Sequence, residues 1–184
     1  MKNASSKIIL VAALVGLSCA AQAADIYLGL GLGGGGVRTT NPVNGVADNF
    51  GASASQFLAG VKLNENVAIE GEYVVMGQFQ NSPRLDLSGA GISAVAIMPF
   101  SNDKYSLFWK VGLMNMASKL TAGPGGTLTA SSSESKTGVS LGFGGQIAFT
   151  PNIALRVMIN SYEYSYLSDT GRAAMINAAG VFTF

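Results

Sequence analysis

Apolar and polar residues alternate along most of this chain with a period of two. In the last segment, residues 173–184, Ala174, Ile176 and Phe182 share one face, and Met175 and Asn177 share the other. This is the period of a β-strand, in which successive side chains point to opposite faces of a sheet. The alternation predicts eight strands, at 26–36, 53–63, 67–79, 85–98, 105–113, 139–149, 153–160 and 173–184.

The fourth predicted strand, residues 85–98, has the weakest pattern. One of its faces carries Leu87 and Val95, and the other carries Ile92 and Met98, so the two faces are similarly apolar. A bulge or a change of register in this strand would explain such a pattern. We therefore expect the strand to exist but leave its facing open.

The connections between the predicted strands alternate in character. Short turns are predicted at 64–66, 99–104 and 150–152. Links that are longer, or richer in Gly, Ser, Asn and Pro, are predicted at 34–52, 79–84, 118–135 and 165–171. Short turns at one end and longer loops at the other are typical of a bacterial outer-membrane barrel, whose short turns face the periplasm.

A closed sheet follows from the physics of the bilayer. An unpaired backbone group in hydrocarbon costs several kcal/mol, so an open sheet edge is not tolerated there. We therefore predict an all-β fold, an eight-stranded antiparallel up-and-down transmembrane β-barrel. Its terminal Phe182 and Phe184 are expected in the aromatic girdle, where they would also serve as an assembly signal.

The first residues have the features of a secretory leader. Lys2 and Lys7 provide a basic start, residues 8–17 are continuously apolar, and Ala21-Gln22-Ala23 is a small-residue cleavage site. The apolar stretch is too short for a membrane-spanning helix, which needs roughly 20 residues. We expect a signal peptide at 1–23 and a single barrel domain at 24–184.

Cys19 is the only cysteine of the chain and would leave with the leader. A lipoprotein with a lipidated Cys19 is an alternative, but Gly16 occupies the position where such a motif normally has leucine. A cleaved chain without cysteine has no disulfide bonds. The stability of the protein must then come from the sheet itself.

Charge is scarce in this chain. Charged residues make up 11% of the sequence, and the mean hydropathy is +0.35. The formal net charge of +1 becomes −1 once Lys2 and Lys7 are removed with the leader. A nearly neutral chain gives no reason to expect a nucleic-acid partner.

Several polar side chains fall on the inward faces of the predicted strands. Buried charges persist only when they are paired and hydrogen-bonded. We therefore predict an interior network of Glu70 and Glu72 with Lys110 and Arg156, with Gln146 and Asn160 as neutral partners and Lys62 as a further candidate. The network could simply fill and block the lumen, or it could gate a narrow ion path.

Three tyrosines, Tyr162, Tyr164 and Tyr166, recur at every second position in the seventh strand. We interpret them as an interfacial aromatic cluster, with a platform for stacking a ligand as the alternative. Strict alternation would place them on the same side as Arg156, and the pattern does not decide between the two facings. The run Gly33–Gly36 lacks the Lys-Ser/Thr of a phosphate-binding loop, and we expect a strand end there.

The residue content argues against an enzyme. The chain has no histidine, so a serine nucleophile would lack the base that some small barrel hydrolases use. Ser131 to Ser133 and Ser161 stand in loop or strand-end contexts without a base nearby in the pattern. Without histidine or a retained cysteine, a transition-metal site is unsupported as well. We expect no catalytic residues, no cofactor and no metal.

Turn-plus-strand units carry a resemblance to a known family. The segments FLAGVKLNENVAIEGEY, SAVAIMPFSNDKYSLFWKVGL, GFGGQIAFTPNIALRVMINSYEY and the terminal GVFTF together resemble the OmpA-like eight-stranded outer-membrane barrels. The resemblance implies a small barrel whose polar interior is largely plugged by charges in equivalent strand positions. Longer members of that family add a periplasmic peptidoglycan-binding domain, which we do not expect here.

These observations favour a structural protein of a Gram-negative outer membrane, which supports the envelope and offers loops for surface interaction. The expected partners are outer-membrane lipid and lipopolysaccharide, and the barrel-assembly machinery through the C-terminal strand. One alternative is a narrow, low-conductance pore gated by the interior network. Another is a soluble, lipocalin-like carrier, which would place its apolar residues inside the barrel.

Overall fold

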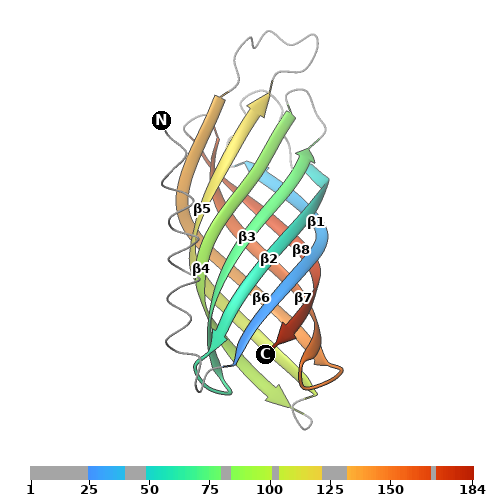
Figure 1. Ribbon diagram of the computed structural model, residues 1–184. Helices are drawn as coiled ribbons and strands as arrows, with labels where there is room; N and C mark the ends of the chain where they lie inside the picture. Colours follow the sequence, from blue (N-terminus) through green and yellow to red (C-terminus); the bar gives the residue numbers. More distant parts are fainter. Residues whose placement is uncertain (1–24, 40–48, 80–83, 101–103, 122–131, 167–168) are drawn as a thin grey trace, which may run out of the picture.

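Eight antiparallel strands close into a barrel in the computed structural model (Figure 1). The structure describes residues 25–39, 49–79, 84–100, 104–121, 132–166 and 169–184; the expected leader, residues 1–23, lies outside them. The strands are β1 (Ile26–Thr39), β2 (Asn49–Lys62), β3 (Val67–Phe79), β4 (Arg84–Phe100), β5 (Tyr105–Thr121), β6 (Ser132–Ala148), β7 (Ile153–Tyr166) and β8 (Asp169–Thr183). The predicted fold class is confirmed.

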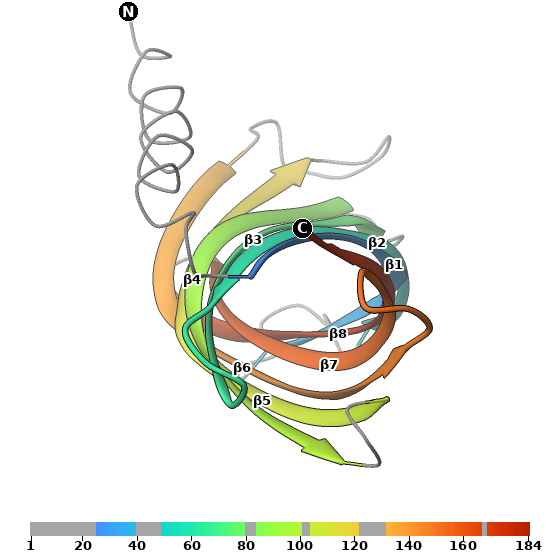
Figure 2. The same cartoon turned by 60° about the horizontal axis from the view of Figure 1, so that its bottom comes forward.

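Pairing of the first strand with the last closes the barrel. β1 pairs with β2 on one side and with β8 on the other, from Tyr27 opposite Thr183 to Thr39 opposite Gly171. The backbone N–H of Phe184 donates to the carbonyl of Ile26 at 2.9 Å, so the C-terminal residue extends this seam. Figure 2 shows the resulting ring from its turn end, the end that carries the turns 63–66 and 149–152. We call the opposite end the loop end.

The alternation of the sequence becomes the two faces of the barrel wall. Large apolar side chains are exposed on its outer surface, among them Leu30, Leu32, Trp109, Val111, Leu141, Phe143, Ile159 and Ile176. β4 follows the same rule, since Leu87 and Val95 are buried inside while Ile92 and Met98 are exposed outside. The irregularity expected in β4 lies instead in the partner strand, where the β3–β4 register shifts between Met76 and Phe79. Within the described residues, no helix is long and apolar enough to cross a membrane.

Except for β3, which has the predicted bounds, the strands are longer than predicted, mainly at the loop end. β4, β5 and β6 have 17 residues each, whereas about 9–11 suffice to cross the hydrocarbon. β5 continues to Thr121 and β6 begins at Ser132, so much of the expected 118–135 loop is paired sheet. The expected loops 79–84 and 165–171 shrink to the connections 80–83 and 167–168. Serine, threonine and charged residues in these segments resembled loop sequence, but they form strands beyond the apolar band.

Side chains define the tight turns at the turn end. The side-chain oxygen of Asn64 accepts a hydrogen bond from the backbone N–H of Asn66 at 2.8 Å. In the third turn, the hydroxyl of Thr150 accepts from the backbone N–H of Ile153 at 3.0 Å, and the Asn152 amide donates to the carbonyl of Thr183 at 2.7 Å. Asn and Thr side chains suit such positions because they can replace backbone partners locally. The short turns predicted from these residues are confirmed.

Candidate functional site

Four ionisable side chains lie side by side in the middle of the barrel interior. Glu70 and Glu72 come from β3, Lys110 from β5 and Arg156 from β7, and each of these side chains is at most 5% exposed. They reach the interior because each stands at an inward position of an alternating strand. Residues up to 86 positions apart in the sequence are thereby brought into contact.

Glu70 and Arg156 form the first centre of this network. The Nη1 of Arg156 lies 2.5 Å from the Oε2 of Glu70. The hydroxyl of Tyr27 donates to the same oxygen at 3.0 Å, and the Nζ of Lys110 lies 3.5 Å from the Oε1 of Glu70. Both carboxylate oxygens therefore have donors, as a buried carboxylate requires.

Arg156 is held by more than its ion pair. Its Nε donates to the Oε1 of Gln146 at 3.0 Å. Its guanidinium carbon also lies 5.2 Å from the centre of the Tyr27 ring and 4.7 Å from the centre of the Phe108 ring. A planar guanidinium suits this position because it can stack on rings while its N–H groups remain available as donors.

Glu72 and Lys110 form the second centre. The Nζ of Lys110 lies 2.7 Å from the Oε2 of Glu72, and the hydroxyl of Tyr162 donates to that oxygen at 3.3 Å. The side-chain amide of Gln56 donates to it as well. Because Lys110 contacts both carboxylates, it links the two centres into one network with as many positive as negative groups.

A chain of amides extends the network around the wall. Asn160 donates to the Oδ1 of Asn177 at 3.3 Å, and Asn177 donates to the Oε1 of Gln56 at 2.8 Å. The Nε2 of Gln56 in turn donates to Glu72. This chain passes over β1 at Gly31, where an added Cβ would lie 2.6 Å from the Nδ2 of Asn177. A glycine at this position therefore leaves room for the amide of a neighbouring strand.

The structure brings together all six residues that the sequence suggested for the interior, although Asn160 reaches the charges only through Asn177 and Gln56. Lys62 is different: it is part-exposed and lies 3.5 Å from Asp25, so this candidate does not join the network. Tyr27, Gln56, Tyr162 and Asn177 were missed. The alternation could have identified them, since all four occupy inward positions of their strands.

Two apolar layers enclose this polar layer. On the loop side, Val37, Val74, Leu87, Tyr162 and Tyr164 form a cluster with four methionines, Met76, Met114, Met116 and Met175. On the turn side, Tyr27, Leu58, Val95, Phe108 and Met158 belong to a second cluster. The interpretation of the tyrosines as an interfacial cluster is wrong for Tyr162 and Tyr164, which are fully buried inside; the Tyr166 side chain lies outside the described residues.

The polar layer is not completely satisfied by protein groups. The Oε1 of Glu72, the hydroxyls of Ser93 and Ser140, and the Oδ1 of Asn160 are buried without a hydrogen-bond partner among the described residues. Each such atom lowers the net stabilisation that a buried network can give. In the described part of the chain, no group of three His, Cys, Asp or Glu side chains is placed to hold a metal ion.

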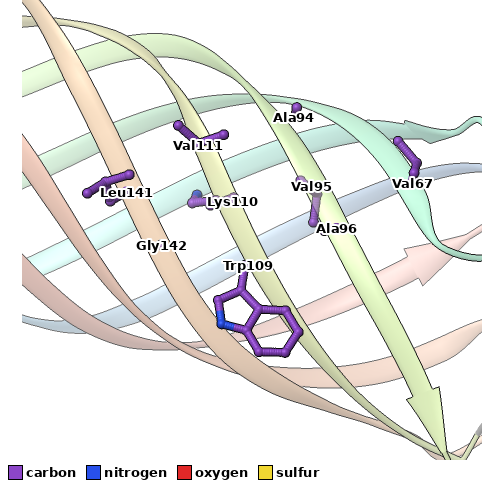
Figure 3. Close-up of a pocket in the computed structure, with 9 residues that line it drawn as sticks. All are labelled: Val67, Ala94, Val95, Ala96, Trp109, Lys110, Val111, Leu141 and Gly142. Carbon is purple, nitrogen blue, oxygen red and sulfur yellow. The ribbon is translucent and has the colours of Figure 1, made fainter.

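The outer surface opposite the network carries a shallow apolar groove (Figure 3). It is lined by outward side chains that include Val67, Ala94, Ala96, Trp109, Val111 and Leu141. Trp109 and Lys110 are adjacent in β5 but serve different sides of the wall, with Trp109 exposed outside and Lys110 buried inside. The groove is therefore a feature of the apolar outer surface.

Solved structures confirm the architecture. Neisserial surface protein A is similar with a TM-score of 0.71 and 14% identity, over 89% of this chain and all of that one. Ail, the attachment invasion locus protein of Yersinia pestis, has a TM-score of 0.59 and 18% identity, over 88% of this chain and 97% of that one. The N-terminal barrel domain of OprF from Pseudomonas aeruginosa has a TM-score of 0.52 and 14% identity, over 85% and 97%. At these identities the likeness concerns the fold.

A comparison with curated proteins found no match. The model of the outer membrane protein β-barrel domain matches residues 9–184, nearly the whole chain. The likeness to OmpA-like barrels that the sequence suggested is thereby confirmed. This chain belongs to the outer membrane protein β-barrel domain family, and its place is the outer membrane of a Gram-negative cell.

Proposed function

We propose that this protein is a closed structural barrel that supports the outer membrane and presents its loop end at the cell surface. The observation that carries the proposal is the layered interior. A charge-balanced polar layer crosses the lumen, and a buried apolar cluster lies on each side of it. An ion would have to leave water and pass both apolar layers, which is costly in a low-dielectric interior.

The distribution of apolar and charged side chains over the two faces of the barrel wall argues against a soluble carrier. Such a carrier needs a polar outer surface and an apolar cavity, whereas here large apolar side chains cover the outside and charges lie within. We further infer that the barrel has no enzymatic activity. The family to which it belongs consists of outer-membrane barrels, and the sequence has no histidine that could act as a base.

The refolded chain 24–184 is expected to give no single-channel current in a planar bilayer, because both apolar layers and the ion pairs block the lumen. Current would be recorded at high salt, with folding verified by the heat-dependent mobility of the barrel on gels. A general porin recorded in the same bilayer is the positive control. Reproducible openings that change when Glu70 is replaced by glutamine would establish the gated pore and overturn the closed barrel.

Assembly is proposed to depend on the C-terminal strand, through contact of Phe184 with the barrel-assembly machinery. Phe184 is largely exposed on the outer surface, and its ring centre lies 4.9 Å from that of Phe182. Little packing would therefore be lost by Phe184→Ala. The substitution is expected to reduce the amount of folded barrel in cells several-fold, while refolding of the purified chain into lipid vesicles stays unchanged.

Phe149→Ala is a matched control for this prediction. Phe149 is a similarly exposed phenylalanine at the turn end, but it is distant from the C-terminus in the sequence. The measurement is the fraction of heat-modifiable protein in outer-membrane preparations. If the two variants lose the same fraction of heat-modifiable protein, or if neither loses any, the proposed role of Phe184 in assembly is contradicted.

A further inference from the structure

The outward face of the β4–β5 pair carries a row of apolar side chains that runs from the turn end toward the middle of the barrel wall. On both strands every second residue points outward, so residues that pair directly lie side by side on this face. We call the eight outward residues of this row the β4–β5 track. They are Phe100 opposite Tyr105, Met98 opposite Leu107, Ala96 opposite Trp109, and Ala94 opposite Val111.

The half of the track that is farther from the turn end lies in the apolar groove of the outer wall. Ala94 and Ala96, two small residues of β4, form the floor of this groove. Trp109 and Val111 stand on one side of the floor, on β5, and Val67 stands on the other side, on β3 (Figure 3). The volume of the groove is about 480 Å³, which is within the range of sites that hold small molecules. Because the wall faces hydrocarbon, the groove suits an acyl chain.

An aromatic pair and a lysine mark the turn end of the track. The rings of Phe100 and Tyr105 stack with their centres 6.0 Å apart, and the Nζ of the exposed Lys104 lies 5.7 Å from the centre of the Tyr105 ring. Within the part of the chain that the structure describes, Lys104 forms no ion pair, whereas Lys62 at the same end lies 3.5 Å from Asp25. Aromatic residues gather at the boundary between hydrocarbon and headgroups. The uncompensated charge of Lys104 therefore stands at the level of the lipid headgroups.

The track has the length of one leaflet of a bilayer. Tyr105 and Val111 are its two ends on β5, and the strand between them extends over about 20 Å at about 3.3 Å per residue. Strands of such barrels tilt by about 35–45°, so the track rises by about 14 to 16 Å along the membrane normal. This rise is about half of the hydrocarbon thickness of roughly 30 Å. An acyl chain that begins at the headgroup level beside Lys104 therefore reaches the groove.

The position of Lys104 at the turn end determines which lipid the track meets. The short turns of an outer-membrane barrel lie on the periplasmic side. The periplasmic leaflet of an outer membrane consists of phospholipid, whereas lipopolysaccharide occupies the outer leaflet. A lysine ammonium binds a phosphate as a point charge. The lipid that combines such a phosphate with an acyl chain at this depth is a phospholipid.

We propose that the β4–β5 track binds one phospholipid of the periplasmic leaflet, with the phosphate at Lys104 and one acyl chain in the groove beside Trp109. An anionic headgroup such as phosphatidylglycerol is preferred, because phosphatidylcholine carries its own ammonium group next to the phosphate. The site lies on the outer wall of the barrel. It therefore does not depend on whether the lumen is closed.

Trp109 can report on this site because it lines the groove and is the only tryptophan of the chain. The chain 24–184 is refolded into vesicles that contain equal amounts of phosphatidylglycerol and phosphatidylcholine. Either one lipid or the other carries bromine atoms in the middle of its acyl chains, where bromine quenches tryptophan fluorescence on contact. Phosphatidylglycerol is expected to be enriched about fivefold over phosphatidylcholine at Trp109, which is the effect of about one lysine near a membrane surface.

Two variants test the two parts of the site, each with a matched control. Lys104→Gln is expected to abolish the enrichment, whereas Lys62→Gln, which removes a lysine that is paired with Asp25 at the same end, should keep it. Ala96→Leu fills the floor of the groove and is expected to lower the enrichment at least twofold. Ala178→Leu, at an exposed small residue of β8, should leave the enrichment unchanged.

Equal quenching by the two brominated lipids in the wild type would overturn the site, because Trp109 would then contact each lipid only in proportion to its amount. The site is also wrong if Lys62→Gln loses as much enrichment as Lys104→Gln, or if Ala96→Leu loses none. Unbrominated lipopolysaccharide is added as a competitor. If it displaces brominated phosphatidylglycerol more effectively than unbrominated phosphatidylglycerol does, the assignment to phospholipid is overturned. The closed-barrel proposal is decided by the conductance measurement, so the two proposals can fail separately.

Discussion

Replacing Arg156 by methionine is expected to lower the free energy of unfolding by about 3 to 5 kcal/mol, the range typical of breaking a buried ion pair. The change leaves Glu70 with Lys110 as its remaining cation, at 3.5 Å, and removes the donor to Gln146. It also removes the guanidinium from between the rings of Tyr27 and Phe108. Trp109, the only tryptophan, lies on the outer surface and reports unfolding by urea through its fluorescence.

Arg156→Lys is the matched control for this prediction. Lysine keeps the positive charge near Glu70 but lacks the planar group that stacks on two rings while donating to Gln146. Its loss of stability should therefore lie between those of the wild type and the methionine variant. If methionine and lysine destabilise the barrel equally, geometry rather than charge dominates at this site. A methionine variant as stable as the wild type would contradict the proposed role of the network.

Lys110→Met is expected to destabilise the barrel by about 3 kcal/mol or more, because it removes the one cation that contacts both carboxylates. Glu70 keeps Arg156 and Tyr27 as partners. Among the described residues Glu72 keeps the neutral donors Gln56 and Tyr162, so a buried negative charge loses its counter-charge. The measurement is again the urea midpoint in lipid vesicles, recorded by the fluorescence of Trp109.

The double variant Lys110→Met/Glu72→Gln separates the cost of an unpaired charge from the loss of the pair itself. Removing both charges leaves no uncompensated ion, and neutral replacements of buried pairs are often tolerated. The double variant should therefore recover a large part of the stability that Lys110→Met loses. A double variant less stable than Lys110→Met alone would contradict the ion pair as the source of the effect.

Much of the fold could be predicted because the decisive signal is local. An alternation with a period of two depends only on neighbouring residues, and it identified all eight strands and the facing of Glu70, Glu72, Lys110 and Arg156. Short turns could be recognised because Asn and Pro favour them through their own backbone preferences. Strand ends at the loop end were less predictable, since beyond the apolar band a paired strand has the serine- and charge-rich composition of a loop.

The facing of two tyrosines was predicted wrongly because the prediction relied on residue type, although the alternation alone would have given the right answer. Tyr162 and Tyr164 were interpreted as interfacial because aromatic residues gather at membrane boundaries. They are nevertheless an even number of residues from Arg156 in β7 and therefore lie on the same face, and the structure places them inside. For Lys62 the alternation alone was not sufficient. Lys62 stands at an inward position of β2, but it lies at the turn end of the strand, where its Nζ is 3.5 Å from the Oδ2 of Asp25, and so it does not join the network.

The sequence by itself thus determined the strands, the facing of most of them and the closed class of the fold, because each follows from local alternation and from the need to pair every backbone group in a membrane. Only the tertiary structure decided which inward side chains meet across the lumen. That choice depends on the stagger of the strands around the ring, which places Arg156 against Glu70 and Lys110 between two carboxylates. The close approach of β7 to β6 at Glu163 and Gly138 likewise depends on how the strands bend around the ring, and alternation carries no information about it.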